Sequence, residues 1–205
     1  EWISYYDELP QEESGVFRYT VAAVDLAISQ ATSADYTAIV LAKVFGYGPK
    51  MRIHILPHPV NQRLNFPAQE EKIKRLSEEY KRRITILIES NGYQRALVES
   101  LEKDGYPVKG IQNIGQDKRA RLSLITPYLK NGMVLFPKNG ADILIRQLLG
   151  FGVEKHDDLA DAFAMVVDYC AQNNGKSPSE TLEDFFRMNK HLLRHNPEAL
   201  WNKKF

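Results

Sequence analysis

A change in the pattern of apolar residues, after about residue 60, constrains the fold of this 205-residue chain most strongly. Before it, three strand-like segments, 17–28, 36–45 and 51–60, follow one another with only short turns between them. These segments are rich in alternating or β-branched apolar residues, and the turns contain glycine or small polar residues. Because short turns join antiparallel strands, this part of the sequence predicts an antiparallel meander.

Helical and strand-like segments alternate in the rest of the chain. We expect helices at 67–83, 94–104, 117–131 and 141–150, short strands at 84–89, 108–111 and 133–136, and a final helix from about residue 158. Pro127 lies inside one of these helices and should kink or split it. Hairpin strands followed by strand–helix alternation predict an α/β fold with a mixed β-sheet, first antiparallel and then parallel, flanked by helices.

The two ends of the chain differ from the part between them. Residues 1–16 are acidic and contain Pro10, which indicates an irregular linker or arm. Residues 17–172 carry the strand and helix patterns and are long enough for one domain with a substantial core. Residues 173–205 are polar with a helical pattern, and we interpret them as a C-terminal appendix.

Composition excludes several classes of protein. The net charge is +1, so a nucleic-acid-binding surface would require local clustering of basic residues. Cys170 is the one cysteine, which excludes a disulfide within the chain and a cysteine-based zinc site. No apolar run has the length of a membrane span, and we expect no membrane partner.

Two acidic residues stand at the ends of apolar strands. Asp25 follows Val-Ala-Ala-Val, and Glu89 follows the apolar run 84–88. Burying an unpaired charge is costly, so an acid beside a core strand needs an explanation. The simpler interpretation is that each strand ends there and the acid is solvated.

Three further acids, Asp157, Asp158 and Asp161, open the last apolar helix. Acids in a first turn can simply cap the helix and complement its dipole. Together with the two strand ends, however, they predict a metal site, because neighbouring strand ends lie ~5 Å apart. An all-carboxylate ligand set suits hard cations such as Mg²⁺ or Mn²⁺, and two such ions ~4 Å apart can support phosphodiester hydrolysis.

The helical spacing ranks these three acids. Asp158 lies at the boundary between the apolar stripe and the polar face, whereas Asp157 and Asp161 are expected to face away from the stripe. We therefore expect Asp158 to matter most, with Asp157 or Asp161 serving a second ion.

Basic residues form two groups that could contact the phosphates of a nucleic acid. Lys118, Arg119 and Arg121 stand at the start of a predicted helix, where they could reach a phosphate. The second group lies within residues 72–83, but neighbouring glutamates dilute its charge, as on a solvated helix face.

Three motifs carry a resemblance to a known family. They are Val24-Asp25-Leu26-Ala27 with Asp35-Tyr36-Thr37-Ala38, Ile88-Glu89-Ser90-Asn91-Gly92, and His156-Asp157-Asp158-Leu159-Ala160-Asp161-Ala162. Their order resembles the ribonuclease H-like nuclease superfamily. More narrowly, it resembles the C-terminal nuclease domain of large terminase subunits from tailed phages.

The resemblance implies a set of site residues. Asp25, Glu89 and Asp158 would be catalytic, and the metal ligands would be Asp25, Glu89 and Asp157 with Asp158. Asp161 matches a further acid of related Holliday-junction resolvases, so the two resemblances differ on which acid joins Asp158.

The resemblance also implies a function. The chain would be a divalent-metal-dependent endonuclease that cuts double-stranded viral DNA concatemers during genome packaging in the host cytoplasm. Its partners would be an N-terminal ATPase domain of the same full-length chain, linked through residues 1–16, and the portal and small terminase subunit. A Holliday-junction resolvase or transposase-like nuclease, and a non-catalytic DNA or motor docking module, remain the alternatives.

Overall fold

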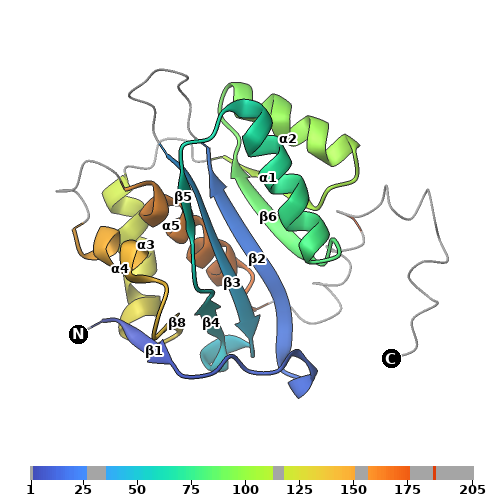
Figure 1. Cartoon of the computed structure of the whole chain (residues 1–205). Helices are drawn as coiled ribbons and strands as arrows, with labels where there is room; N and C mark the ends of the chain where they lie inside the picture. Colours follow the sequence, from blue (N-terminus) through green and yellow to red (C-terminus); the bar gives the residue numbers. More distant parts are fainter. Residues whose placement is uncertain (1, 27–35, 113–117, 151–156, 176–186, 188–205) are drawn as a thin grey trace.

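The computed structural model describes residues 2–26, 36–112, 118–150, 157–175 and 187 (Figure 1). Within these ranges, none of the helices is both long and apolar enough to cross a bilayer.

The described part contains eight strands, five α-helices and two short 3₁₀ helices. The strands are β1 (Ser4–Tyr6), β2 (Phe17–Asp25), β3 (Thr37–Phe45), β4 (Arg52–Ile55), β5 (Val60–Gln62), β6 (Ile84–Glu89), β7 (Val108–Ile111) and β8 (Val134–Pro137). The α-helices are α1 (Phe66–Glu79), α2 (Tyr93–Lys103), α3 (Lys118–Lys130), α4 (Asp142–Leu149) and α5 (Asp158–Gln172). The 3₁₀ helices are η1 (Glu12–Ser14) and η2 (Gly48–Lys50).

The strands form one mixed sheet in the order β1-β8-β4-β3-β2-β6-β7, and β5 pairs with β3 beyond this path. The pairs β2–β3, β3–β4 and β3–β5 are antiparallel. The pairs β2–β6, β6–β7, β4–β8 and β1–β8 are parallel. This arrangement confirms the predicted mixed sheet, in which hairpin strands come first and parallel strands follow.

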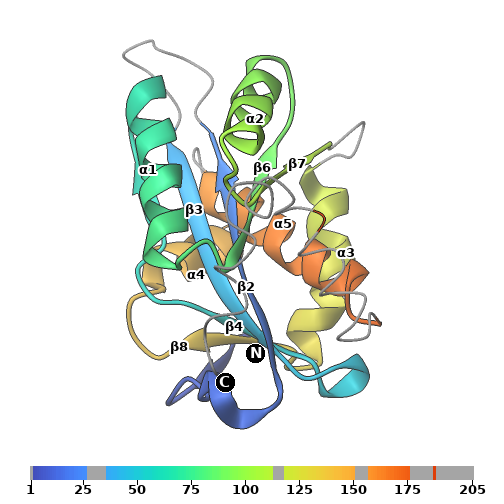
Figure 2. The ribbon, with the colours of Figure 1, turned by 90° about the vertical axis from the view of Figure 1, so that its right-hand side faces the viewer.

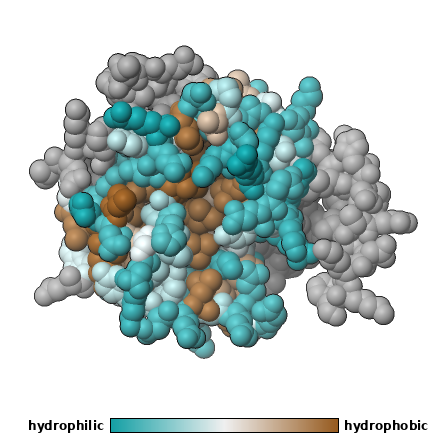
Figure 3. Space-filling view, in the orientation of Figure 1, coloured by the Kyte–Doolittle hydropathy of each residue, from teal (hydrophilic) through white to brown (hydrophobic). Residues whose placement is uncertain are grey.

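Two apolar cores lie on opposite faces of the sheet. Side chains of α3, α4 and α5 pack on one face, and side chains of α1 and α2 pack on the other. Figure 2 shows α1 and α3 on opposite sides of the sheet. Among the described helices, none covers the strip of sheet beside α1, and Figure 3 shows apolar surface in the middle of this face. Leu41 on β3 and Val60 on β5 are only partly buried.

The prediction of an irregular N-terminal arm was wrong for one segment. Ser4–Tyr6 forms β1, an edge strand that pairs in parallel with β8. Three residues without clear alternation give too little periodicity for the sequence to indicate a strand. Pro127 does not split α3, which continues through it. The proposed appendix, residues 173–205, lies almost entirely outside the described residues.

The helix α5 runs antiparallel to β2. Beyond its C-terminal end, the carbonyl of Asn173 accepts a hydrogen bond from Arg18 Nη2 (2.9 Å), near the start of β2. The 15 residues of α5 span ~22 Å, and the distance from Arg18 to Asp25 along β2 is ~23 Å. The start of α5 therefore lies at the level of Asp25.

A glutamine from α4 fixes the start of α5. The N-cap residue Asp157 makes no side-chain capping hydrogen bond. Instead, the buried Oε1 of Gln147 accepts a hydrogen bond from the backbone N–H of Leu159 (2.9 Å). Gln147 thus replaces an N-cap side chain and attaches the first turn of α5 to α4.

We expect Gln147→Leu to lower the free energy of unfolding by about 1–3 kcal/mol, because the buried N–H of Leu159 loses its acceptor. Urea denaturation measures this change. The control is Gln172→Leu, which removes an exposed glutamine bonded to Asp168 on the same helix and should cost less than about 0.5 kcal/mol. Equal stability of Gln147→Leu and the wild type would contradict this role.

His54 on β4 is buried between aromatic rings. It is 5% exposed, and its ring makes edge contacts with Tyr6 and Phe45. Burial disfavours the charged imidazolium and lowers the pKa of His54 from its ordinary value of 6.5 to about 4. Between these two values, the unfolded chain binds a proton at His54 and the folded chain does not.

The free energy of unfolding should therefore fall as the pH is lowered from 6.5 towards 4, and His54→Phe should remove that part of the decrease. Urea denaturation of both proteins across this pH range measures the difference. Parallel curves for wild type and His54→Phe would refute this origin of acid sensitivity.

Candidate metal centre

Asp25 and Glu89 end neighbouring parallel strands of the sheet. In the register of β2 and β6, Val24 pairs with Ile88, and each acid is the next residue along its strand. Adjacent strands lie ~4.8 Å apart, so the two acids stand side by side at the carboxyl edge. In Figure 1 the arrowheads of β2 and β6 both point to this edge, at the top of the view.

Both acids belong to the face of the sheet that α5 covers. Side chains alternate between faces along a strand. Ala23 and Leu87, each two residues earlier, are buried in the core that contains α5. Asp25 and Glu89 therefore lie on the α5 face, and both are half-buried.

The helix α5 begins at the same edge and brings three acids to it. Asp157 is the N-cap residue, and Asp158 and Asp161 lie in the first turn. Asp157 and Asp158 are half-buried, and the Oδ2 atom of Asp158 is inaccessible to solvent. The five acids that we predicted as ligands therefore share one edge and one face of the sheet.

The prediction that Asp161 faces away from the core was wrong, since Asp161 is only 5% exposed. Every residue of 159–167 is buried, because α3 and α4 cover the side of α5 that the sheet does not. The first turns of α5 thus have no solvent face, and the apolar stripe alone could not show this.

The donor chemistry fits a hard divalent cation. All five side chains are carboxylates, and carboxylate oxygens are preferred ligands of Mg²⁺ and Mn²⁺. In the described ranges, however, no three Asp, Glu, His or Cys side chains are close enough to hold one ion together. The elements bring the acids to one edge without forming a closed ligand set.

Two amide side chains, which the sequence analysis missed as site residues, fix the strand ends. The Nδ2 of Asn91 donates a hydrogen bond to Glu89 Oε1 (2.7 Å), which orients that carboxylate. The buried Gln94 accepts from the Asn91 N–H (3.3 Å) and donates to the carbonyl of Leu26 (3.4 Å). Gln94 thereby joins the turn after Glu89 to the residue after Asp25. The spacing Asn-x-x-Gln, similar to a capping box, was an available signal.

A glycine on β7 leaves space for the same turn. A Cβ atom on Gly110 would lie 3.0 Å from the Cβ of Ser90, the residue after Glu89. The Ser90 N–H also donates to the carbonyl of Ile111 (2.8 Å). A side chain at position 110 would push this turn away from β7, so Gly110 helps to position Glu89.

The predicted DNA-binding residues Lys118, Arg119 and Arg121 lie in the first turn of α3. Their side chains are outside the described part of the structure, as are all atoms of His156 and Asp35. The helix α3 follows β7, and β7 is parallel to β6. The start of α3 therefore lies towards the carboxyl edge of the sheet, where the acids are.

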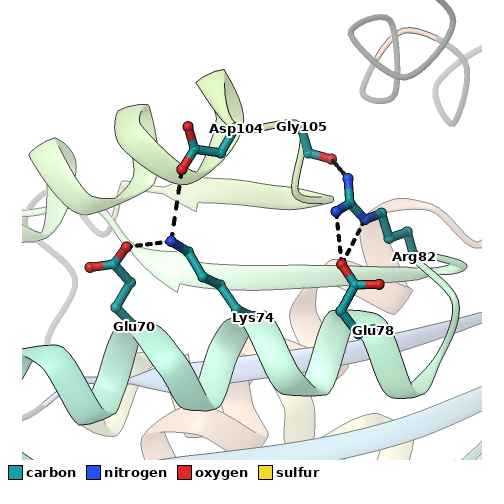
Figure 4. A network of polar contacts seen from close by, with 6 residues as sticks. All are labelled: Glu70, Lys74, Glu78, Arg82, Asp104 and Gly105. Carbon is teal, nitrogen blue, oxygen red and sulfur yellow. Dashed lines mark hydrogen bonds and ion pairs between the residues drawn. The ribbon is translucent and has the colours of Figure 1, made fainter. Parts of the chain in front are cut away.

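Acids on and beside α1 neutralise part of the second basic group, residues 72–83 (Figure 4). Lys74 pairs with Glu70 (2.7 Å) and lies 3.8 Å from Asp104. Arg82 pairs with Glu78 (2.7 Å) and also donates to the carbonyl of Gly105. These pairs favour the interpretation of α1 as a solvated helix face.

Comparison with known proteins links this chain to a family. Residues 22–169 match the family described as "Terminase RNaseH-like domain". A search of curated proteins gives no match.

Three solved structures illustrate the likeness of the fold. The human cytomegalovirus terminase nuclease domain, soaked with manganese and bound to an inhibitor, is 14% identical with a TM-score of 0.55, over 82% of this chain and 89% of that one. The zinc-bound large terminase nuclease of thermophilic phage G20c is 15% identical with a TM-score of 0.54, over 82% and 94%. The large terminase of a second thermophilic bacteriophage is 12% identical with a TM-score of 0.55, over 80% of this chain but 42% of that one.

The fold is therefore ribonuclease H-like, as predicted. The family match covers more than half of the sequence and includes the end of β2 with Asp25, all of β6 and most of α5. This chain belongs to the terminase ribonuclease H-like domain family.

Proposed function

We propose that this chain is the nuclease of a viral large terminase subunit, a divalent-metal-dependent endonuclease that cuts double-stranded DNA concatemers during genome packaging. One observation carries the proposal: Asp25 and Glu89 end adjacent parallel strands, on the face and at the edge where α5 begins with three more acids. Capping does not explain Asp157, since its side chain makes no capping bond.

Asp25, Glu89 and Asp158 would hold the catalytic metal, with Asp157 or Asp161 contributing to a second ion. The bound ions would supply Lewis-acid activation of water and stabilisation of the leaving oxygen. Solved relatives support this choice of cofactor, because structures of the G20c nuclease are described with bound zinc, magnesium or cobalt. Asn91 would keep Glu89 in a ligating orientation, and Gln94 would keep the two strand ends at a fixed separation.

The fold also suggests how DNA and partner domains are arranged. Lys118, Arg119 and Arg121, at the start of α3, would contact DNA phosphates on the β7 side of the acids. The chain aligns with 42% of the large terminase from the second thermophilic bacteriophage. This partial coverage supports the proposal that the chain is one part of a larger motor protein that also has an ATPase domain. By the same family relation, the portal and small terminase subunit would be partners in the host cytoplasm.

We expect the purified chain to nick and linearise supercoiled plasmid with Mn²⁺ or Mg²⁺, and to stop when EDTA is added in excess. Agarose gels measure the conversion. The matched control is Asp25→Asn, which removes one carboxylate charge and should abolish cutting while circular dichroism stays unchanged. Cutting that persists in EDTA, or in Asp25→Asn, would exclude this mechanism.

The acids of α5 should differ in their effects. Asp158→Asn should abolish cutting at every Mn²⁺ concentration, whereas Asp157→Asn should cut slowly and recover as Mn²⁺ is raised. Loss of a helix cap costs about 1 kcal/mol of stability. Because Asp157 makes no capping bond, Asp157→Asn should not show this loss. Cutting rates against Mn²⁺ concentration, with urea denaturation alongside, measure both effects. Wild-type cutting by Asp158→Asn would show that α5 is placed differently against the sheet.

A further inference from the structure

We propose that Arg63, stacked on the ring of Tyr36, binds a phosphate of the DNA backbone next to the acids, on the side opposite α3. This inference rests on the proposed function and names a further DNA contact for it.

The pairing of strands places both residues at the carboxyl edge. Thr37 pairs with Gln62, so Tyr36 and Arg63 are the next residues beyond that pair. On the other side of β3, Ala38 pairs with Asp25. Asn61, which pairs with Ala38, is two strand spacings from Asp25, and Arg63 lies two residues further along the chain. Arg63 is thus ~12 Å from the position of Asp25.

The guanidinium group of Arg63 is held in place and remains exposed. Its Cζ lies 5.0 Å from the centre of the Tyr36 ring, a cation–π contact, and Arg63 is exposed while Tyr36 is half-buried. Within the described residues, Arg63 makes no ion pair with an acid. Arg75 on α1 and Arg82 in the turn after it differ, because each is paired with a glutamate of α1.

This arrangement suits a phosphate. A planar guanidinium donates paired hydrogen bonds to phosphate oxygens, and stacking on a ring reduces the freedom that it would lose on binding. The acids at the same edge repel DNA, so a nearby cation is needed to hold the backbone against them. Because the DNA rise is about 3.4 Å per nucleotide in each strand, ~12 Å corresponds to about three to four nucleotides. Arg63 would then contact a phosphate about that far from the cut.

The order of strands sets where the two basic sites lie. The acids end β2 and β6, with β7 and the start of α3 on one side and β3 with β5 on the other. Arg63 and the first turn of α3 therefore flank the acids. A DNA duplex lying across the carboxyl edge would meet a cation on each side of the cleavage site.

The test is fluorescence anisotropy of a short labelled duplex in Ca²⁺ over a range of salt concentrations. Arg63→Ala and Arg63→Gln should bind several-fold more weakly, and the slope of log affinity against log salt should decrease by about 1. Tyr36→Leu should weaken binding with little change in slope, because it keeps the charge and removes the ring. Arg75→Ala is the matched control, since it removes an exposed arginine paired with Glu71 on α1 and should leave the slope unchanged.

Two results would overturn the inference: a wild-type slope in both Arg63 variants, or an equal decrease in slope in Arg75→Ala, which would indicate a general charge effect. The proposed function fails separately. If the wild-type chain neither binds the duplex nor cuts plasmid with Mn²⁺, both proposals fall. If it binds and cuts while the Arg63 variants do so equally well, only the Arg63 contact is excluded.

Discussion

The burial of β2 on both faces is the constraint on which the rest of the structure depends. Val21, Ala22, Ala23 and Val24 are fully buried, alternately in the core under α5 and in the core under α1 and α2. An ionised side chain within this run would be separated from water in either core, which is costly. A carboxylate on this strand is therefore tolerated only where the strand ends. The same reasoning applies to β6, and it makes the carboxyl edge of the sheet the place where acids gather.

Much of this arrangement could be predicted from the sequence, because it follows from local periodicity. Runs of apolar residues closed by Asp25 and Glu89 indicate strand ends, and the acids before an apolar helix indicate its start. The burial of Asp161 could not be predicted, since a helical stripe shows one buried face and gives no information on α3 and α4 packing behind it. The contribution of Gln147 depends on a contact between two helices, which a local pattern does not reveal.

The distribution of charge separates basic residues that stabilise the protein from those available to a ligand. Arg75 on α1 and Arg82 just after this helix are each paired with a glutamate four residues earlier. Such a local pair contributes little stability, but it neutralises the arginine. Arg63 is held by an aromatic ring, which orients the guanidinium and leaves its charge in place. Counting basic residues along the sequence would favour α1 as the surface that binds a phosphate. The described contacts instead favour Arg63, in the loop after β5.

The antiparallel course of α5 along β2 has a consequence for the order of events during synthesis. The acids come from three well-separated parts of the sequence, and the sheet can bring Asp25 and Glu89 together before α5 has left the ribosome. Until α5 docks, with its first turn attached to Gln147, the strand ends hold an incomplete set of carboxylates. The set of carboxylates is therefore completed last, after α5 has left the ribosome and packed against the sheet.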